Sequence, residues 1–255
     1  MASEFYSKPK KNNNPFEIIK PEQLTIELLA TLETTQDTDT HRNIPSPSTV
    51  DDCIRRLVYN MAGVVKTEGT PVAALLAAEQ GKSQEVIVEK ILTLMGREYI
   101  TQLPVDILEG GTCDFLVDDE EVWDVKRLGL FRYLRLIQYG LKEAHPSYYS
   151  QLQLYMAGLG KKRAVLLAFS ADHSAVTYYW NRRGWSLETR VPPLWTETIE
   201  YDSKWIDSRV KRGKEISHNI KLNNPKKTPR DYNPLMDKFP CSLWCSWKTQ
   251  CIRDG

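Results

Sequence analysis

The sequence GGTCDFLVDDEEVWDVK, residues 110–126, decides the centre of the fold. Its two apolar runs are typical of β-strands, and the polar residues 118–120 between them supply a turn, so the stretch predicts a β-hairpin. Asp114 lies on the first strand, and Asp124 and Lys126 lie on the second, where residues two apart project from the same face. Two carboxylates and an amine on a largely apolar pleat are costly to bury unless a cation or a reaction needs them. The hairpin is therefore the first candidate for a functional site.

Length and composition limit the class of protein. The chain has 255 residues, of which 41% are hydrophobic and 26% charged, enough for one good core with appended segments. Its formal net charge is only +1, so a polyanionic partner must meet a local basic patch. No apolar run approaches the roughly 20 residues that span a bilayer, and the N-terminus has no apolar signal core. We expect an intracellular (cytoplasmic) protein without membrane contact, cellular or virus-encoded. Five cysteines argue against a disulfide framework and leave metal binding open.

Helices and strands alternate through the middle of the chain, which predicts a mixed α/β domain. Ser48 is positioned to cap a helix that begins at Thr49 and ends near Gly63. The other predicted elements are helices over Ser83–Met95 and Leu128–Leu141, a helix that opens at Pro146 and closes at Gly158 and Gly160, and strands over Tyr99–Leu108, Arg163–Phe169 and Ala175–Trp180.

Two of the predicted helices carry polar residues at helical spacing. Glu85 and Glu89 are one turn apart, as are Gln151 and Tyr155, so each pair shares a face. The ordinary interpretation is a solvated face for the glutamates, a core position for Tyr155 and a surface position for Gln151. The alternative is that one glutamate and the Gln151–Tyr155 pair point into the site formed by the hairpin.

Cationic residues gather in two places. The helix predicted over Leu128–Leu141 is interleaved with Arg127, Arg132 and Arg135, and is either a lid or DNA-facing helix or an ordinary amphipathic one. The segment Lys204–Arg230 holds nine Lys or Arg against two acids. Such a run is typical of a solvated, flexible segment, and also of a surface that phosphates pass.

Three cysteines, Cys241, Cys245 and Cys251, fall within eleven residues near the C-terminus. In an intracellular chain this spacing favours metal ligands over core filling. An all-sulfur site suits zinc or an iron–sulfur cluster and needs a fourth thiolate. Cys53, which taken alone is typical of a small core residue, and Cys113 are the candidates. Cys113 neighbours an acid in a strand, so we expect it on the opposite side of the sheet from the acids, under the hairpin. We therefore favour Cys53.

Together, GTCD at 111–114, DVK at 124–126 and QLQLY at 151–155 resemble the motifs of the PD-(D/E)XK nuclease superfamily, in its RecB-like branch. CIRR at 53–56 and the cysteine triplet narrow the resemblance to the iron–sulfur RecB-type exonucleases, which include the CRISPR-associated Cas-four family and the AddB nuclease domain. The resemblance spans roughly residues 48–251. The chain departs from the family pattern in having three residues, rather than two, between the first two cysteines of the triplet, and a cysteine in place of the proline before the first acid.

The resemblance implies a restriction-endonuclease-like α/β core: a mixed central sheet, helices on both faces, and an iron–sulfur clasp that joins the N- and C-terminal segments. It divides the chain into a disordered or loosely ordered segment 1–47, a nuclease core 48–203, and a basic segment with the cysteine cluster, 204–255. It implies a metal-dependent DNA exonuclease that hydrolyses phosphodiester bonds in single strands or at a free end.

The resemblance also implies a set of site residues. The family places a histidine or glutamate four residues after a glycine in the first core helix, so Glu85, four after Gly81, is favoured over Glu89. The implied ligands of Mg²⁺ or Mn²⁺ are Glu85, Asp114, Asp124 and the backbone carbonyl of Val125, and the implied catalytic residues are Asp114, Asp124, Lys126, Gln151 and Tyr155. The implied ligands of a [4Fe–4S] cluster are Cys53, Cys241, Cys245 and Cys251. The implied phosphate contacts are Arg55 and Arg56, with the Lys204–Arg230 run.

Other functions stay open at this point. A nucleic-acid-binding module with a decayed nuclease site, a structural zinc protein with incidental hairpin acids, and an endonuclease on the same fold are the alternatives. The pathway is open among recombination and repair, CRISPR adaptation and viral genome processing. Strand polarity is open too, as is association into a homo-oligomer or with a recombination or CRISPR partner protein.

Overall fold

The computed structural model describes residues 44–68, 72–182, 191–235, 241 and 245–255. Five strands form one mixed sheet in the order β1-β2-β3-β4-β5. Only β3 and β4 run parallel, and the other neighbours are antiparallel. The strands are β1 (Tyr99–Val105), β2 (Gly111–Val117), β3 (Glu121–Leu128), β4 (Arg163–Ser170) and β5 (Leu194–Glu200).

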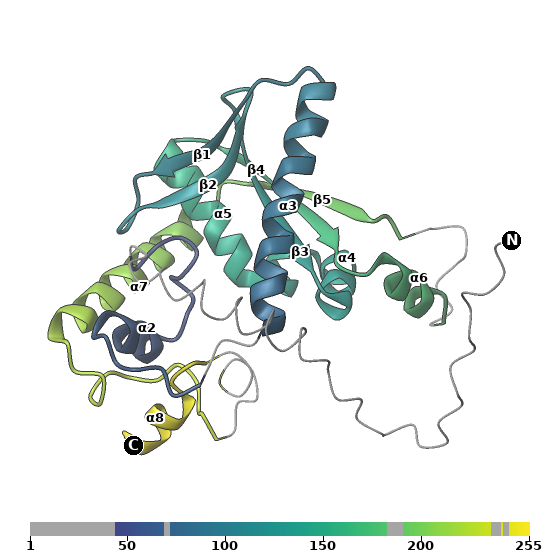
Figure 1. The fold of residues 1–255 in the computed structure, drawn as a ribbon. Helices are drawn as coiled ribbons and strands as arrows, with labels where there is room; N and C mark the ends of the chain where they lie inside the picture. Colours follow the sequence, from purple (N-terminus) through teal and green to yellow (C-terminus); the bar gives the residue numbers. More distant parts are fainter. Residues whose placement is uncertain (1–43, 69–71, 183–190, 236–240, 242–244) are drawn as a thin grey trace, which may run out of the picture.

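Helices cover both faces of the sheet (Figure 1). The helix α3 packs on one face, where Val88 and Leu92 meet Phe115 and Val125 in a buried cluster. On the other face α4 and α5 form the crossover between the parallel strands β3 and β4, as a parallel connection requires. The helices are α2 (Ile54–Met61), α3 (Val72–Leu94), α4 (Leu130–Ala144), α5 (Pro146–Leu159), α6 (His173–Arg182), α7 (Ser203–Leu222) and α8 (Lys248–Arg253).

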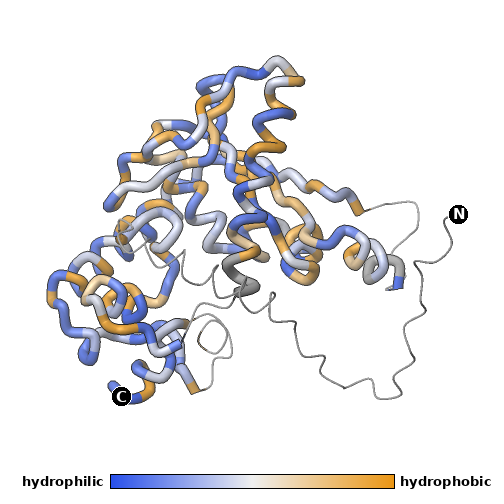
Figure 2. The backbone as a smooth tube through the Cα atoms, viewed as in Figure 1, coloured by the Kyte–Doolittle hydropathy of each residue, from blue (hydrophilic) through white to orange (hydrophobic). Residues whose placement is uncertain are grey.

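The central strand β4 explains why the core lies where it does. Its sequence RAVLLAFS is apolar along nearly its whole length, and the residues from Ala164 to Ala168 are buried on both faces. Such a continuous run is what a strand covered by helices on both sides needs. Figure 2 shows the hydrophobic residues concentrated along the central strands. The mixed α/β architecture predicted from the sequence is confirmed.

The hairpin and the helix α5 are confirmed near their predicted bounds. The hairpin turn places Asp118 and Asp119 at positive φ, 51° and 54°, a conformation that aspartate tolerates better than most residues. The helix α5 begins with Pro146 at its first position and ends at Gly160, whose φ of 66° is the left-handed cap that glycine favours. These local signals therefore determined both elements.

Three element predictions are wrong. The helix predicted from Thr49 begins at Ile54, because Ser46 and Thr49 bond each other in a turn before it. The helix predicted from Ser83 begins at Val72 and contains Gly81.

The strand predicted over Ala175–Trp180 is the helix α6. Asp172 accepts a bond from the backbone N–H of Ala175 at 2.9 Å, as a helix-capping side chain does. The fifth strand is β5, which the prediction missed.

Most of the basic segment is helical. The helix α7 occupies Ser203–Leu222, and Asp202 caps it by accepting a bond from the N–H of Trp205 at 3.1 Å. Ile206 and Ile216 of α7 pack with Ile54 and Leu57 of α2 and with Leu154 of α5. Residues 1–43, most of the N-terminal segment 1–47 that was predicted to be disordered or loosely ordered, lie outside the described residues. The division into three domains stays a prediction.

No helix among the described residues is both long and apolar enough to cross a bilayer.

Candidate active site

Asp124 and Lys126 form an ion pair in the interior of the fold. Both project from β3 on the side of α5, the side on which Val122 and Leu128 of the same strand are buried. Asp124 is completely buried. The ammonium of Lys126 lies 2.7 Å from Oδ1 and 2.6 Å from Oδ2 of Asp124. Only the contact to Oδ1 has hydrogen-bond geometry, so Oδ2 is buried without a hydrogen-bond donor among the described residues.

Asp114 lies where the hairpin strands separate. The register of β2 with β3 begins at Phe115, opposite Trp123, so Asp114 lies just outside the paired part. Its Oδ2 accepts a bond of 2.7 Å from the backbone N–H of Val125, which holds the carboxylate beside β3. Asp114 is therefore brought to the Asp124–Lys126 pair by a single side-chain-to-backbone bond.

Glu85 reaches the same place from α3. The amide of Gln102 in β1 donates to its Oε2 at 3.0 Å. Burial raises the pKa of Glu85, and the negative charge of Asp114 raises it further. Glu85 also acts on Asp124 electrostatically, so the three carboxylates share one region. We call Glu85, Asp114, Asp124 and Lys126 the acid–lysine cluster.

Gln151 and Tyr155 close the cluster from α5. The amide of Gln151 donates to the hydroxyl of Tyr155 at 2.7 Å, and both side chains are buried. Burial raises the pKa of Tyr155, and the charge of Asp124 is the next largest cause, which places the two groups close together. The alternative that Gln151 is an ordinary surface residue is therefore wrong.

The surroundings of the ion pair raise the pKa of both Lys126 and Asp124. Burial raises the pKa of Asp124, with Asp114 and Glu85 adding to the effect while Lys126 opposes it. Burial disfavours the charge on Lys126, but Asp124 and Asp114 outweigh this and raise its pKa. An excess of carboxylates around one amine is the condition in which a further cation would be stabilised.

The donors of the cluster suit a hard divalent cation. Carboxylate oxygens are the ligands that Mg²⁺ and Mn²⁺ prefer, and Glu85, Asp114 and Asp124 supply such oxygens, among them Oδ2 of Asp124, which has an ion-pair contact but no hydrogen bond among the described residues. In the described part of the chain, no three His, Cys, Asp or Glu converge closely enough to hold a metal ion without rearrangement. The cluster therefore has the chemistry of a cation site, and its carboxylates would have to rotate to share one ion.

The four predicted cluster cysteines line one cavity of about 1050 Å³. Cys53 comes from the start of α2, and Cys241, Cys245 and Cys251 come from the C-terminal segment. Burial raises the pKa of Cys245, and the thiols of Cys53 and Cys251 are near enough to contribute. The described thiols line one cavity, but they are not close enough together to hold a metal ion. No iron–sulfur clasp is therefore evident.

Cys113 does not lie where we expected. It is fully buried in the core cluster that also contains Val122 and Leu128. It therefore lies on the same side of the sheet as Asp124 rather than opposite it. The strict alternation of a strand failed as a guide here, because the hairpin strands separate at Asp114 and Gln102 of the neighbouring β1 has a positive φ.

Arg55 is buried in a structural position, and its predicted contact with phosphate stays a prediction. It is 5% exposed, and its guanidinium donates to the carbonyls of Thr228 at 2.8 Å and Lys226 at 3.1 Å. It thus ties α2 to the segment after α7. Arg56 lines the cavity and pairs with Asp52 at 3.6 Å.

Two further residues of α5 that make specific contacts were not predicted, and the first of them lies beside the cluster. Tyr148 lies with its ring centre 5.2 Å from the ammonium of Lys126. It is three residues before Gln151, so the helical spacing that paired Gln151 with Tyr155 could have indicated it. Gln153 is buried and bonds the carbonyl of Glu200 at 2.7 Å and the N–H of Asp202 at 2.8 Å, which ties α5 to the residues between β5 and α7.

Comparison with known proteins shows the fold and no family. No family model matches the sequence, and no curated protein matches it. The crystal structure of a protein named SSO0001 is similar over 92% of this chain and 98% of its own, with a TM-score of 0.53 and 14% identity. At that identity the likeness shows a shared fold alone.

Two exonuclease structures are similar at lower scores. An alkaline exonuclease (LHK-Exo) from Laribacter hongkongensis matches over 57% of this chain and 69% of its own, with a TM-score of 0.43 and 18% identity. A phage-related exonuclease from Haemophilus somnus 129PT matches over 67% of this chain and 78% of its own, with a TM-score of 0.45 and 16% identity. At these scores neither likeness carries an argument about this chain.

Proposed function

We propose that the protein is a metal-dependent nuclease that hydrolyses DNA phosphodiester bonds at the acid–lysine cluster. The observation that carries this proposal is that Asp114, Asp124 and Lys126 lie together on neighbouring strands, with Glu85 of α3 near enough to act on both aspartates electrostatically. Burying such charges costs free energy, and a stable fold does not require it. The motif resemblance supplies the reaction that would use them.

Glu85, Asp114 and Asp124 are the residues that would hold a divalent cation, with the carbonyl of Val125 as the further ligand implied by resemblance. A bound Mg²⁺ or Mn²⁺ would lower the pKa of a coordinated water and offset negative charge on the phosphate. Asp114 is kept beside Val125 by its bond to the Val125 amide, so an acid and a carbonyl of neighbouring strands face one point.

Lys126 would act on the reacting phosphate directly. Its amine is charged and held against Asp124, so it needs no reorganisation to stabilise the negative charge that develops on phosphate oxygens. Gln151 and Tyr155, bonded to each other beside Asp124, would position the attacking water or the DNA backbone. Exonucleolytic action on single strands is the finer part of the proposal and rests on the resemblance.

The test is digestion of end-labelled linear DNA with Mg²⁺ and with Mn²⁺. Asp124→Asn and Lys126→Ala should each lower the rate about 10²-fold or more, the usual cost of losing a transition-state contact. Asp119→Asn, a matched acid at the exposed hairpin tip that pairs with Lys161, should keep the wild-type rate. If the wild type binds DNA but does not cleave it with either metal, the nuclease proposal is wrong and the protein is a nucleic-acid-binding module. Cleavage of circular single-stranded DNA would replace the exonuclease with an endonuclease.

We also infer that Cys53, Cys241, Cys245 and Cys251 hold a [4Fe–4S] cluster. The support is that these thiols, from opposite ends of the described chain, line one cavity, and that all-sulfur sites suit iron–sulfur clusters or zinc. Protein purified without oxygen should absorb visible light and contain iron and sulfide. Cys251→Ala should lose both, and Cys113→Ala, a matched change at a buried cysteine outside the cavity, should keep them. A colourless protein with one bound zinc would replace the cluster with a zinc site.

A further inference from the structure

The cavity that the cysteines line extends to the helix α4, next to the acid–lysine cluster. One of its walls is formed by Arg132 and Arg135 of α4 and by the turn into α5, residues 144–147. The other walls come from α2, from α7 and from the C-terminal segment. The thiols and the α4 arginines thus belong to different parts of one space.

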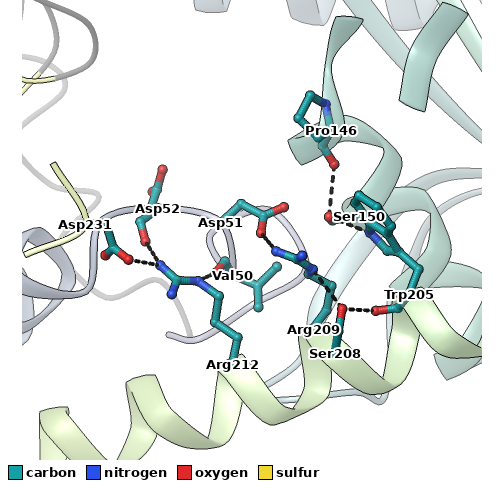
Figure 3. Close-up of polar contacts among 10 residues, drawn as sticks. All are labelled: Val50, Asp51, Asp52, Pro146, Ser150, Trp205, Ser208, Arg209, Arg212 and Asp231. Carbon is teal, nitrogen blue, oxygen red and sulfur yellow. Dashed lines mark hydrogen bonds and ion pairs between the residues drawn. The ribbon is translucent and has the colours of Figure 1, made fainter. Parts of the chain in front are cut away.

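Cationic side chains outnumber acidic ones in the described lining of this cavity. Six Arg or Lys and three Asp are found among its described lining residues. Arg209 pairs with Asp51 and Arg212 with Asp231, as Figure 3 shows. Arg56 pairs with Asp52.

Arg132 and Arg135 differ from these three. Both are exposed, and neither forms an ion pair with a carboxylate in the part of the chain that the structure describes. Two guanidinium groups one turn apart on α4 therefore line the cavity without an ion-paired carboxylate among the described residues.

Tyr148 connects this wall to the cluster. Its ring centre lies 5.0 Å from the guanidinium carbon of Arg132 and 5.2 Å from the ammonium of Lys126. Cations are attracted to an aromatic face at these distances, so the ring holds both of them nearby. Arg132 therefore lies beside Lys126, within reach of a chain that passes through the cluster.

We propose that this cavity binds the single-stranded segment of the nucleic acid that adjoins the scissile phosphate, with Arg132 and Arg135 contacting successive backbone phosphates. This inference rests on the proposed nuclease function, which has the strand continue from the acid–lysine cluster into the cavity. A planar guanidinium binds phosphate oxygens in a two-pronged fashion, which makes an unpaired arginine a better phosphate contact than a lysine.

The single strand as the occupant follows from the proposed nuclease function, and the cavity offers it a wall of exposed arginines apart from the thiols. Tyr148 is a positioning residue in this arrangement, since both of its cations would contact the strand.

The test measures binding apart from cleavage. Fluorescence anisotropy of a short fluorescein-labelled oligothymidylate is recorded in EDTA over a range of salt concentrations. Arg132→Gln/Arg135→Gln should weaken binding at least tenfold, and should reduce the slope of log K against log salt by about 0.7 for each lost phosphate contact. Arg135→Gln alone should remove about half of that slope, and serves if the double variant does not fold. A self-complementary duplex of the same length should bind more weakly than the single strand.

The matched control is Lys90→Gln/Arg163→Gln, which removes two exposed cations outside the cavity. It should bind as the wild type does. An equal loss in both double variants, or no loss in either, would overturn the proposal, because binding would then not involve the α4 wall. Wild-type binding that depends on these arginines but is followed by no cleavage with Mg²⁺ or Mn²⁺ would instead overturn the nuclease function alone. Cleavage by wild-type protein with unaltered binding in the arginine variant would overturn only the inference about the cavity.

Discussion

Asp124 and Lys126 illustrate what two positions on one strand can determine. Residues two apart project from the same face, so the sequence predicts that the two side chains are neighbours. The structure adds that the ammonium lies against both carboxylate oxygens of Asp124, in a place where Asp124 has no exposure. The pair is stable as long as both charges are present, because removing one leaves the other buried and unpaired.

His145 is a second residue whose surroundings set its charge. Burial lowers its pKa, and the charges of Arg132 and Arg135 lower it further, against a partial compensation by its bond to the carbonyl of Arg132 at 2.9 Å. The folded pKa thus lies below the ordinary value of about 6.5. Above that value the imidazole is neutral in both states, and the stability it contributes is fully present.

We predict that the contribution of His145 to the free energy of unfolding falls as the pH drops below about 6.5, because the unfolded chain takes up the His145 proton first. His145→Gln should remove this contribution and so change the pH slope of stability, relative to the wild type, by at most about 1.4 kcal/mol per pH unit. Urea denaturation between neutral pH and pH 5 measures it. His218→Gln, at an exposed position of α7, is the control and should keep the wild-type slope. Identical slopes in all three proteins would contradict the assignment.

At the scale of elements, the position of α5 against the sheet depends on one close approach. A Cβ placed on Gly158 would lie 2.4 Å from Val105 Cγ1 and 3.3 Å from Ile107. Neither neighbour can withdraw easily, since Val105 belongs to β1 and is buried. Gly158 is thus required where α5 crosses the end of β1.

Gly158→Ala should therefore destabilise the protein by about 1–3 kcal/mol through overpacking. The matched change Gly81→Ala, inside α3 with open space around it, should stabilise by about 0.5–1 kcal/mol because alanine is the better helix former. Denaturant unfolding of the two variants measures both effects. A Gly158→Ala variant as stable as the wild type would show that α5 can shift away from β1.

At the scale of the whole molecule, the C-terminal segment closes on α2. The ring of Trp247 stacks on that of Tyr59 with 6.4 Å between centres, and its indole donates to the carbonyl of Val64 at 2.7 Å. The hydroxyl of Tyr59 donates to Asp254 at 2.8 Å. These contacts join the first described helix to the last.

Trp247→Ala should cost about 3–5 kcal/mol, because a large buried side chain and its bond are lost. The C-terminal segment should then be cut early in limited proteolysis, while the sheet stays resistant. Ile252→Ala, at a 39% exposed position of the same short helix, is the control and should change little. Equal protease resistance in wild type and Trp247→Ala would show that another contact, such as a bound cluster, holds the segment.

Sequence by itself determined the features that depend on neighbours along the chain. The hairpin, α5 with its proline and glycine ends, the shared face of Asp124 and Lys126, and the pairing of Gln151 with Tyr155 all follow from local periodicity and turn chemistry. The prediction failed for short segments whose hydrophobic pattern does not distinguish a helix from a strand. The six residues Ala175–Trp180 were predicted to be a strand and belong to α6, and β5 was missed.

Only the tertiary structure decided which distant groups meet. It brought Glu85 of α3 to Asp114 and placed Cys53 on one cavity with the C-terminal cysteines. It also buried Arg55 against carbonyls more than 170 residues away along the chain. The physical reason is that these placements follow from how helices pack on the two faces of the sheet, which is set by the burial of whole surfaces and not by any local pattern.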